Sequence, residues 1–184
     1  MKNIQSGTYN IDATHSNVEF AVKHMMITTV KGRFGDVKGT VEIPEAGEPT
    51  VDVTIGVASI DTRVEARDNH LRSPDFFDVE KYPEMRFVST KAEQTDDGYT
   101  LTGDLTLHGV TRPVKLDVVA EGAGVDPWGN QKAAFSATGK FKRSEFGLNW
   151  NAALETGGVL VSDDVKLSID AQLVKQQAKA EKAA

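Results

Sequence analysis

A group of polar residues near the start of the chain has the side-chain types that hydrolytic chemistry uses. Asp12, His15 and Ser16 lie close together, and in a Ser/His/Asp site the carboxylate orients an imidazole that activates the hydroxyl. No nucleophile elbow or oxyanion motif accompanies Ser16. We therefore predict that these residues are polar side chains at the start of a long strand. The alternative is a lipid-acting hydrolase or isomerase that uses Asp12, His15 or His108.

The histidines do not form a recognisable metal site. His15, His24, His70 and His108 show no HxH, HExxH or other familiar ligand spacing. The chain has no cysteine, which excludes disulfides and thiolate chemistry. We expect no metal, no cofactor and no catalytic residue.

A cluster of charged residues lies in the stretch ARDNHLRSPDFFDVEKYP, residues 66–83. Asp68 and Arg72 have the i, i+4 spacing of a helical ion pair, and Arg63 and Arg67 have the same spacing. The cluster is thus typical of structural ion pairs that hold a helix in place. In the alternative, one of the arginines contacts the polar head of a ligand.

This stretch also carries signals for two short helices. Thr62 and Glu65 match a capping box, which predicts a helix from Arg63 to about Arg72, since Pro74 disfavours helical geometry at the residue before it. Ser73 then caps a second short helix that Pro83 ends. We predict that this insertion, residues 63–82, closes one end of a hollow fold and performs no chemistry.

The elements around the insertion are strands with one apolar and one polar face. The alternation predicts about eight of them, with a break near Gly35. Antiparallel sheets with one solvated face show this pattern, so the residues favour an up-and-down sandwich or barrel. The clearest alternating segments are 17–23, 51–58, 99–107, 114–119, 135–142 and 165–173.

Composition limits the partners that we expect. The chain of 184 residues has 21 basic and 27 acidic side chains, a formal net charge of −6, which argues against nucleic acid and anionic membrane surfaces as main partners. No run reaches the ~20 apolar residues of a membrane span. The first residues lack the apolar core of a signal peptide, so we expect a soluble cytoplasmic protein, or a periplasmic or secreted one if the chain is a processed form.

Several motifs together resemble the YceI-like family of polyisoprenoid-binding, lipocalin-like barrels. They are YNIDATHSNVEFAVKH, GRFGDVKGTVEI, SIDTRVEARDNHLRSPDFFDVEKYPEMRF, GDLTLHGVTRPVKL, KFKRSEFGLNW and VSDDVKLSIDAQL. The resemblance implies an all-β fold: an eight-stranded antiparallel barrel, with the short helical insertion, in a single domain of residues 7–174. The polar tail, residues 175–184, is expected to be disordered or a frayed helix.

The resemblance also implies a function, which is to bind, sequester or transport a long apolar lipid such as an isoprenoid quinone or a polyprenyl compound. Small residues such as Gly103, Ala137 and Gly139 on the inward faces either leave room for a ligand or mark bends in a filled core. In a further alternative, the barrel has a filled core and works through its surface as a stress-related interaction protein. The sequence also leaves a homodimer open. The residues that we expect to contact a ligand are Phe20, Val22, Phe34, Ile55, Val57, Leu71, Phe76, Phe77, Phe87, Leu105, Leu107, Val118, Phe135, Phe141, Phe146, Leu148, Trp150 and Leu167.

Overall fold

The structure is a computed structural model that describes residues 4–96, 98–153 and 158–177. The expected tail after residue 177 lies outside this range. Within the described residues no helix is long and apolar enough to cross a bilayer. The elements are β1 (Gly7–Ile11), β2 (Asn17–His24), β3 (Thr28–Phe34), β4 (Val37–Ile43), β5 (Thr50–Gly56), η1 (Val57–Ser59), β6 (Ile60–Asp61), α1 (Glu65–Arg72), β7 (Glu84–Gln94), β8 (Gly98–Leu107), β9 (Val110–Val125), β10 (Gln131–Lys142), η2 (Arg143–Phe146) and β11 (Asp164–Lys175).

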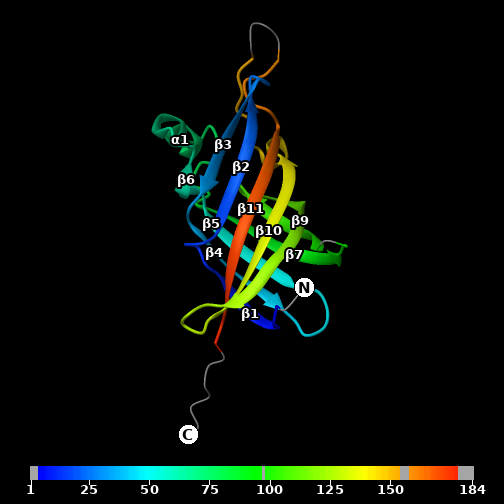
Figure 1. Cartoon of the computed structure of the whole chain (residues 1–184). Helices are drawn as coiled ribbons and strands as arrows, with labels where there is room; N and C mark the ends of the chain where they lie inside the picture. Colours follow the sequence, from blue (N-terminus) through cyan, green and yellow to red (C-terminus); the bar gives the residue numbers. More distant parts are fainter. Residues whose placement is uncertain (1–3, 97, 154–157, 178–184) are drawn as a thin grey trace.

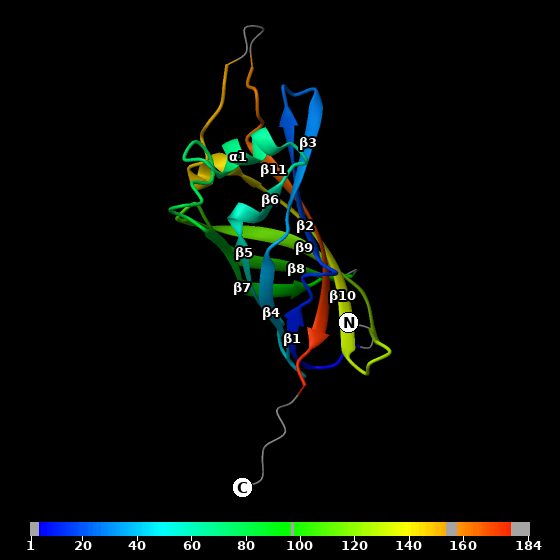
Figure 2. The same cartoon turned by 90° about the vertical axis from the view of Figure 1, so that its left-hand side faces the viewer.

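The sheet closes on itself, which decides between a sandwich and a barrel. β1 pairs with β4 on one side and with β11 on the other, so β1, β4, β5, β7, β8, β9, β10 and β11 form a closed antiparallel barrel of eight strands. Figure 1 shows β10 and β11 running along the long axis, and Figure 2 shows β7, β8 and β9 crossing that direction. The predicted all-β barrel is confirmed.

The wall is interrupted in three places, between β1 and β2, between β3 and β4, and between β5 and β6. β2, β3 and β6 form a ribbon that continues the wall beyond the closed ring. β11 pairs with β1 through its last residues and with β2 through residues 166–170. β2 then pairs with β3, and β3 pairs with β6. The predicted break near Gly35 is the one between β3 and β4. These interruptions let the wall extend at the end of the molecule where α1 lies (Figure 1).

The two ends of the barrel differ in packing. At the end where β11 finishes, Tyr9, Ile43, Ala133 and Leu173 form a buried cluster, each at most 4% exposed. The Tyr9 hydroxyl donates to the Gln5 carbonyl over 2.8 Å, and burial raises the pKa of Tyr9. We call this cluster the plug. It closes the barrel at the end where β11 finishes, which we call the lower end.

The insertion contains one helix and not two. α1 begins at Glu65 after Val64, with no side-chain cap, so the predicted capping box is absent. Residues 73–83 form turns: the Phe77 amide donates to the Leu71 carbonyl, and Asp78 has a positive φ of 46°. The second predicted helix is therefore wrong, because the amides of Phe77, Asp78 and Val79 bond to carbonyls five to seven residues back and so interrupt the helical pattern.

The predicted Asp68–Arg72 ion pair is also wrong. The buried Asp68 carboxylate accepts hydrogen bonds from the Thr62 amide (2.9 Å) and the Thr62 hydroxyl (2.5 Å). Arg72 instead donates to the backbone carbonyls of Ala58 and Ile60. Both contacts tie α1 to the chain that precedes it, so the structural role predicted for the cluster holds with other partners.

Asp12 joins three strands at the interruption between β1 and β2. Its side chain is 14% exposed and contacts Lys132 of β10 (3.1 Å) and Gln172 of β11 (3.0 Å). The Thr14 hydroxyl, which donates over 2.6 Å, is the largest cause of an Asp12 pKa well below its usual range, and Lys132, His15 and Gln172 lower it further. Ionised Asp12 therefore stabilises the folded state.

The substitution Asp12→Asn is expected to lower the free energy of unfolding by about 2 kcal/mol at pH 7. Because the folded-state pKa is depressed, this stability is present above the unfolded pKa of ~3.9 and is lost as the pH falls toward the folded value. Urea unfolding at pH 7 and at pH 3 tests this. A stability difference that is the same at both pH values would contradict it.

Candidate functional site: an elongated apolar cavity

The barrel encloses a cavity of about 440 Å³, within the usual size range of ligand pockets. It extends from Ile43 and Leu173, which belong to the plug, to His24, Leu160 and Val161 at the other end. Along β11 the wall runs from Val165 to Leu173, ~27 Å at strand spacing. The wall is almost entirely apolar, so the cavity is long, narrow and suited to a hydrocarbon chain.

The structure places all but two of the expected ligand-contacting residues in the cavity wall. Those that line it are Phe20, Val22, Phe34, Ile55, Leu71, Phe76, Phe77, Phe87, Leu105, Leu107, Val118, Phe135, Phe141, Leu148, Trp150 and Leu167. Val57 (1% exposed) and Phe146 (0% exposed) are buried in the surrounding core and do not line it. Phe146 packs edge-on against Phe141 at 5.2 Å between ring centroids, so Phe141 separates it from the cavity.

The small inward residues have more than one role. A Cβ atom at Gly103 would lie 2.3 Å from the Phe87 ring, and one at Gly139 would lie 2.6 Å from Leu116. These glycines make room for neighbouring side chains and not for a ligand. Ala137 differs, since it lines the cavity itself. Small size on an inward face thus does not by itself predict a void.

Aromatic side chains from the insertion cover the upper end of the cavity. The His70 ring packs edge-on against Phe76 (5.1 Å) and Trp150 (4.9 Å). The Phe77 ring packs edge-on against Phe34 of β3, with 6.0 Å between the ring centroids. α1 and the 143–150 segment therefore lie side by side, as Figure 2 shows. We call residues 65–82 the lid, because they close the end opposite the plug.

A buried arginine, which the sequence did not single out, organises the wall beside the lid. Arg143 is 6% exposed, and its guanidinium donates to the carbonyls of Leu148 (2.6 Å), Trp150 (2.8 Å) and Ser162 (3.0 Å). Burial lowers the pKa of Arg143, and the nearby Asp163 carboxylate opposes that shift. Arg143 thus joins the segment that carries Trp150 to the start of β11.

Replacing Arg143 with methionine is expected to lower the free energy of unfolding by about 2 kcal/mol, since buried carbonyls lose their donor. Lys142→Met is the matched control, because the adjacent Lys142 side chain is exposed. Chemical denaturation of both variants measures the difference. Equal stabilities would show that the arginine is not a structural donor.

The candidate catalytic residues do not assemble into a triad. Asp12 contacts His15 Nδ1 at 2.9 Å, but the Ser16 hydroxyl instead donates to the Gln172 carbonyl and accepts from the Gln172 amide. His108 packs on Tyr82 and lies 3.2 Å from the Phe146 carbonyl. Within the described ranges no cluster of three or more potential metal ligands occurs.

Comparison with known proteins agrees with this geometry. The model of the YceI-like domain matches residues 9–173. The chain belongs to the YceI-like family. A UPF0312 protein of Pectobacterium atrosepticum is 40% identical over 171 residues, which cover 92% of this chain and 86% of that protein.

Solved structures of YceI-like proteins have the same barrel. The YceI protein of Campylobacter jejuni is 35% identical, with a TM-score of 0.73 over 96% of this chain and 100% of that one. A polyisoprenoid binding domain from Saccharophagus degradans shares the fold at 16% identity, with a TM-score of 0.68 over 94% and 100% of the two chains.

Proposed function

We propose that this YceI-like protein binds one long apolar lipid chain, of the isoprenoid quinone or polyprenyl type, inside the barrel and so sequesters or transports it. The observation that carries the proposal is the elongated cavity itself, which is apolar along its length, plugged at one end and covered by an aromatic lid at the other. A structural neighbour described as a polyisoprenoid binding domain supports the choice of lipid class.

The polar groups near the lid explain where a head group would lie. Arg67, His70 and Trp150 line the upper part of the cavity, whereas apolar residues line the lower part. The Arg67 guanidinium donates to the Thr62 hydroxyl over 2.7 Å and to the Thr62 carbonyl over 2.9 Å, so its position is fixed. The chain therefore points toward the plug, and the polar head lies beside Arg67.

Binding is favoured over catalysis because the cavity offers no acid–base pair. No aspartate or glutamate of the described residues lines it. Arg143 is bound to backbone carbonyls, and the nearest acid to the His70 ring is Asp75, 3.0 Å away with a side chain that is 59% exposed. A general acid–base mechanism needs positioned partners at the reacting atoms.

A chain-length series tests this function. Each buried CH₂ contributes ~0.8 kcal/mol, so quinones with one head group and progressively longer isoprenoid tails should bind delipidated protein with steeply increasing affinity until the cavity is full. Isothermal titration or quenching of Trp150 fluorescence in a Trp128→Phe background measures the dissociation constants. If tail length did not change the affinity, the head group would dominate and the proposal would fail.

A further inference from the structure

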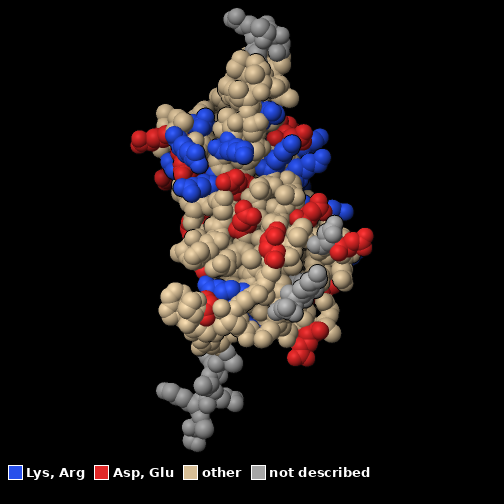
Figure 3. Space-filling model, in the orientation of Figure 1, with Lys and Arg blue, Asp and Glu red and all other residues tan. Residues whose placement is uncertain are grey.

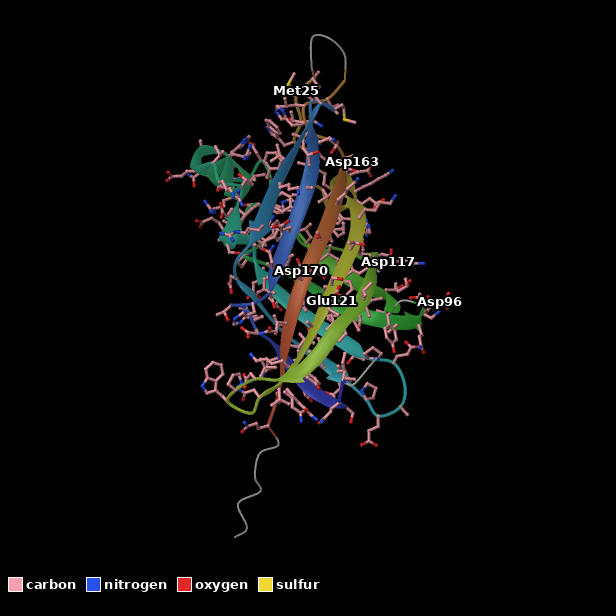
Figure 4. The ribbon with its side chains drawn as sticks, viewed as in Figure 1. Met25, Asp96, Asp117, Glu121, Asp163 and Asp170 are labelled. Atoms are coloured by element: carbon pink, nitrogen blue, oxygen red, sulfur yellow. The ribbon has the colours of Figure 1, made fainter. Side chains whose placement is uncertain are left out.

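An exposed apolar apex stands beyond the upper end of the barrel. It consists of Met25 (41% exposed), Met26 (63%), Ile27 (75%) and Val159 (42%). The first three form the tip of the β2–β3 hairpin, and Val159 belongs to the adjoining segment, whose Leu160 carbonyl accepts a 2.7 Å hydrogen bond from the Met25 amide. Figure 4 places Met25 at this extremity.

The backbone at the apex holds the methionines in a strained turn. Met25 and Met26 have φ values of 52° and 59°, and the Ile27 amide donates to the His24 carbonyl over 3.1 Å. Two central residues with positive φ define a type I′ turn, which favours Asn-Gly. Strained backbone of this kind clusters at functional sites, and here it presents two flexible apolar side chains to the solvent.

A belt of lysines lies below the apex on four neighbouring strands. Lys140 of β10 lies opposite Lys166 of β11, Lys166 opposite Ala21, and Ala21 opposite Lys31 of β3, which forms one row across four strands. Two further lysines lie nearer the apex. Lys23 is two residues beyond Ala21 on β2, and Lys142 is two residues beyond Lys140 on β10. The basic belt is Lys23, Lys31, Lys140, Lys142 and Lys166, all exposed.

The charge of the surface is segregated along the long axis. Figure 3 shows basic side chains in a band beneath the apex and most acidic ones of that face below it. Asp117, Glu121 and Asp170 lie toward the middle of the molecule in Figure 4. Among the ion pairs of the described residues, none involves a lysine of the belt, although Asp164 lies opposite Lys142.

We propose that the apolar apex and the basic belt dock the protein on an anionic lipid bilayer, with the apex inserted among the acyl chains and the belt against the head groups. Lys23 lies two residues before Met25, ~7 Å along the strand direction, which falls within the ~5–10 Å depth that interfacial apolar groups reach. Lysines at this depth lie within a Debye length of the head-group charge.

This orientation connects the surface with the cavity. His24, Leu160 and Val161 line the upper end of the cavity and support the apex from inside. A docked protein therefore has the lid end of its cavity at the bilayer, where a lipid can enter, and the plug faces the solvent. The inference extends the proposed function, since docking provides the route by which the lipid is loaded.

Vesicle co-sedimentation tests the docking. Wild-type protein should bind vesicles of phosphatidylglycerol and phosphatidylcholine, bind pure phosphatidylcholine far more weakly, and dissociate as salt is raised. The variant Met25→Asn/Met26→Gly/Ile27→Thr, which favours the same turn without its apolar side chains, should bind at least about tenfold more weakly. Lys140→Gln/Lys166→Gln should lose roughly fivefold per lysine. Trp128→Ser alters an 84% exposed tryptophan of the loop between β9 and β10, which lies at the opposite end of the molecule (Figure 1), and should bind as the wild type does.

A second readout separates docking from lipid binding. The apex variant should take up a polyprenyl quinone from ethanol as the wild type does, but should extract it from anionic vesicles at least about tenfold more slowly. Normal quinone uptake by a wild-type protein that ignores anionic vesicles would overturn the docking and leave the proposed function intact. Apex-dependent self-association without vesicle binding would assign the surface to a second copy of the chain and would also overturn it. Vesicle binding without quinone uptake would support docking and defeat the proposed function.

Discussion

The Ala137→Trp variant is expected to lose lipid binding by ~100-fold while it keeps the fold. Ala137 lies on β10 between Phe135 and Phe141 and lines the cavity, so a tryptophan side chain there projects into the lumen. Displacing about four CH₂ groups of a bound chain removes ~3 kcal/mol of burial, which corresponds to this loss in affinity. The measurement is polyprenyl quinone bound per mole of delipidated protein.

The adjacent residue provides a matched control. Thr138 is exposed and lies on the outer face of the same strand, so Thr138→Trp adds the same side chain outside the barrel. It should bind quinone as the wild type does. If Thr138→Trp weakens binding as much as Ala137→Trp, the lipid does not occupy the lumen.

Replacing Phe76 and Phe77 together with alanine is expected to weaken lipid retention by ~100-fold. Phe76 is 8% exposed and packs at 5.0 Å against Trp150, and both Phe76 and Phe77 line the cavity. Losing roughly half of the burial of each ring costs ~1.5 kcal/mol per residue. Related binding sites differ mainly in dissociation rate, so the release of a bound quinone to excess acceptor vesicles should be correspondingly faster.

The lid variant needs a control for general effects on the insertion. Glu80→Ala alters an exposed side chain of the same segment and should release lipid at the wild-type rate. The barrel of the double alanine variant should remain folded, since the strands do not depend on the lid for their pairing. Wild-type release from the double variant would show that the segment does not cover the cavity.

Local pattern was enough to predict the strands, but not how the barrel closes. Alternation at Phe135, Ala137 and Phe141 reports which side chains share a face, and those residues do face inward. A sandwich and a barrel have the same alternation. The deciding contact pairs Tyr9 with Lys175, residues at opposite ends of the chain, so it depends on a register that no local signal encodes. The family resemblance supplied it.

The lid shows where local signals mislead. The sequence from Thr62 to Pro83 contains helix caps and helix-compatible prolines, yet only residues 65–72 are helical. Thr62 directs its hydroxyl to Asp68 instead of capping the helix, and Asp78 adopts a positive φ. Burial of Phe76 against Trp150, which lies far away in the sequence, outweighs the preference for a second helix.

Charge shows a similar limit. The formal net charge of −6 argues against an anionic membrane, but net charge carries no information on how charges are distributed. Lys31, Lys140 and Lys166 are far apart in the sequence, and only strand pairing brings them into one row. Likewise, Arg143 is one of many arginines until the fold surrounds it with carbonyls.

Mass spectrometry of an organic extract of the protein, purified from its native source without detergent, tests the central claim most directly. If the cavity is a lipid-binding site, the wild type should release close to one equivalent of a long-chain apolar lipid per molecule, and Ala137→Trp purified in parallel should release almost none. An extract without such a lipid, or equal amounts from both proteins, would contradict the assignment of the barrel as a lipid carrier.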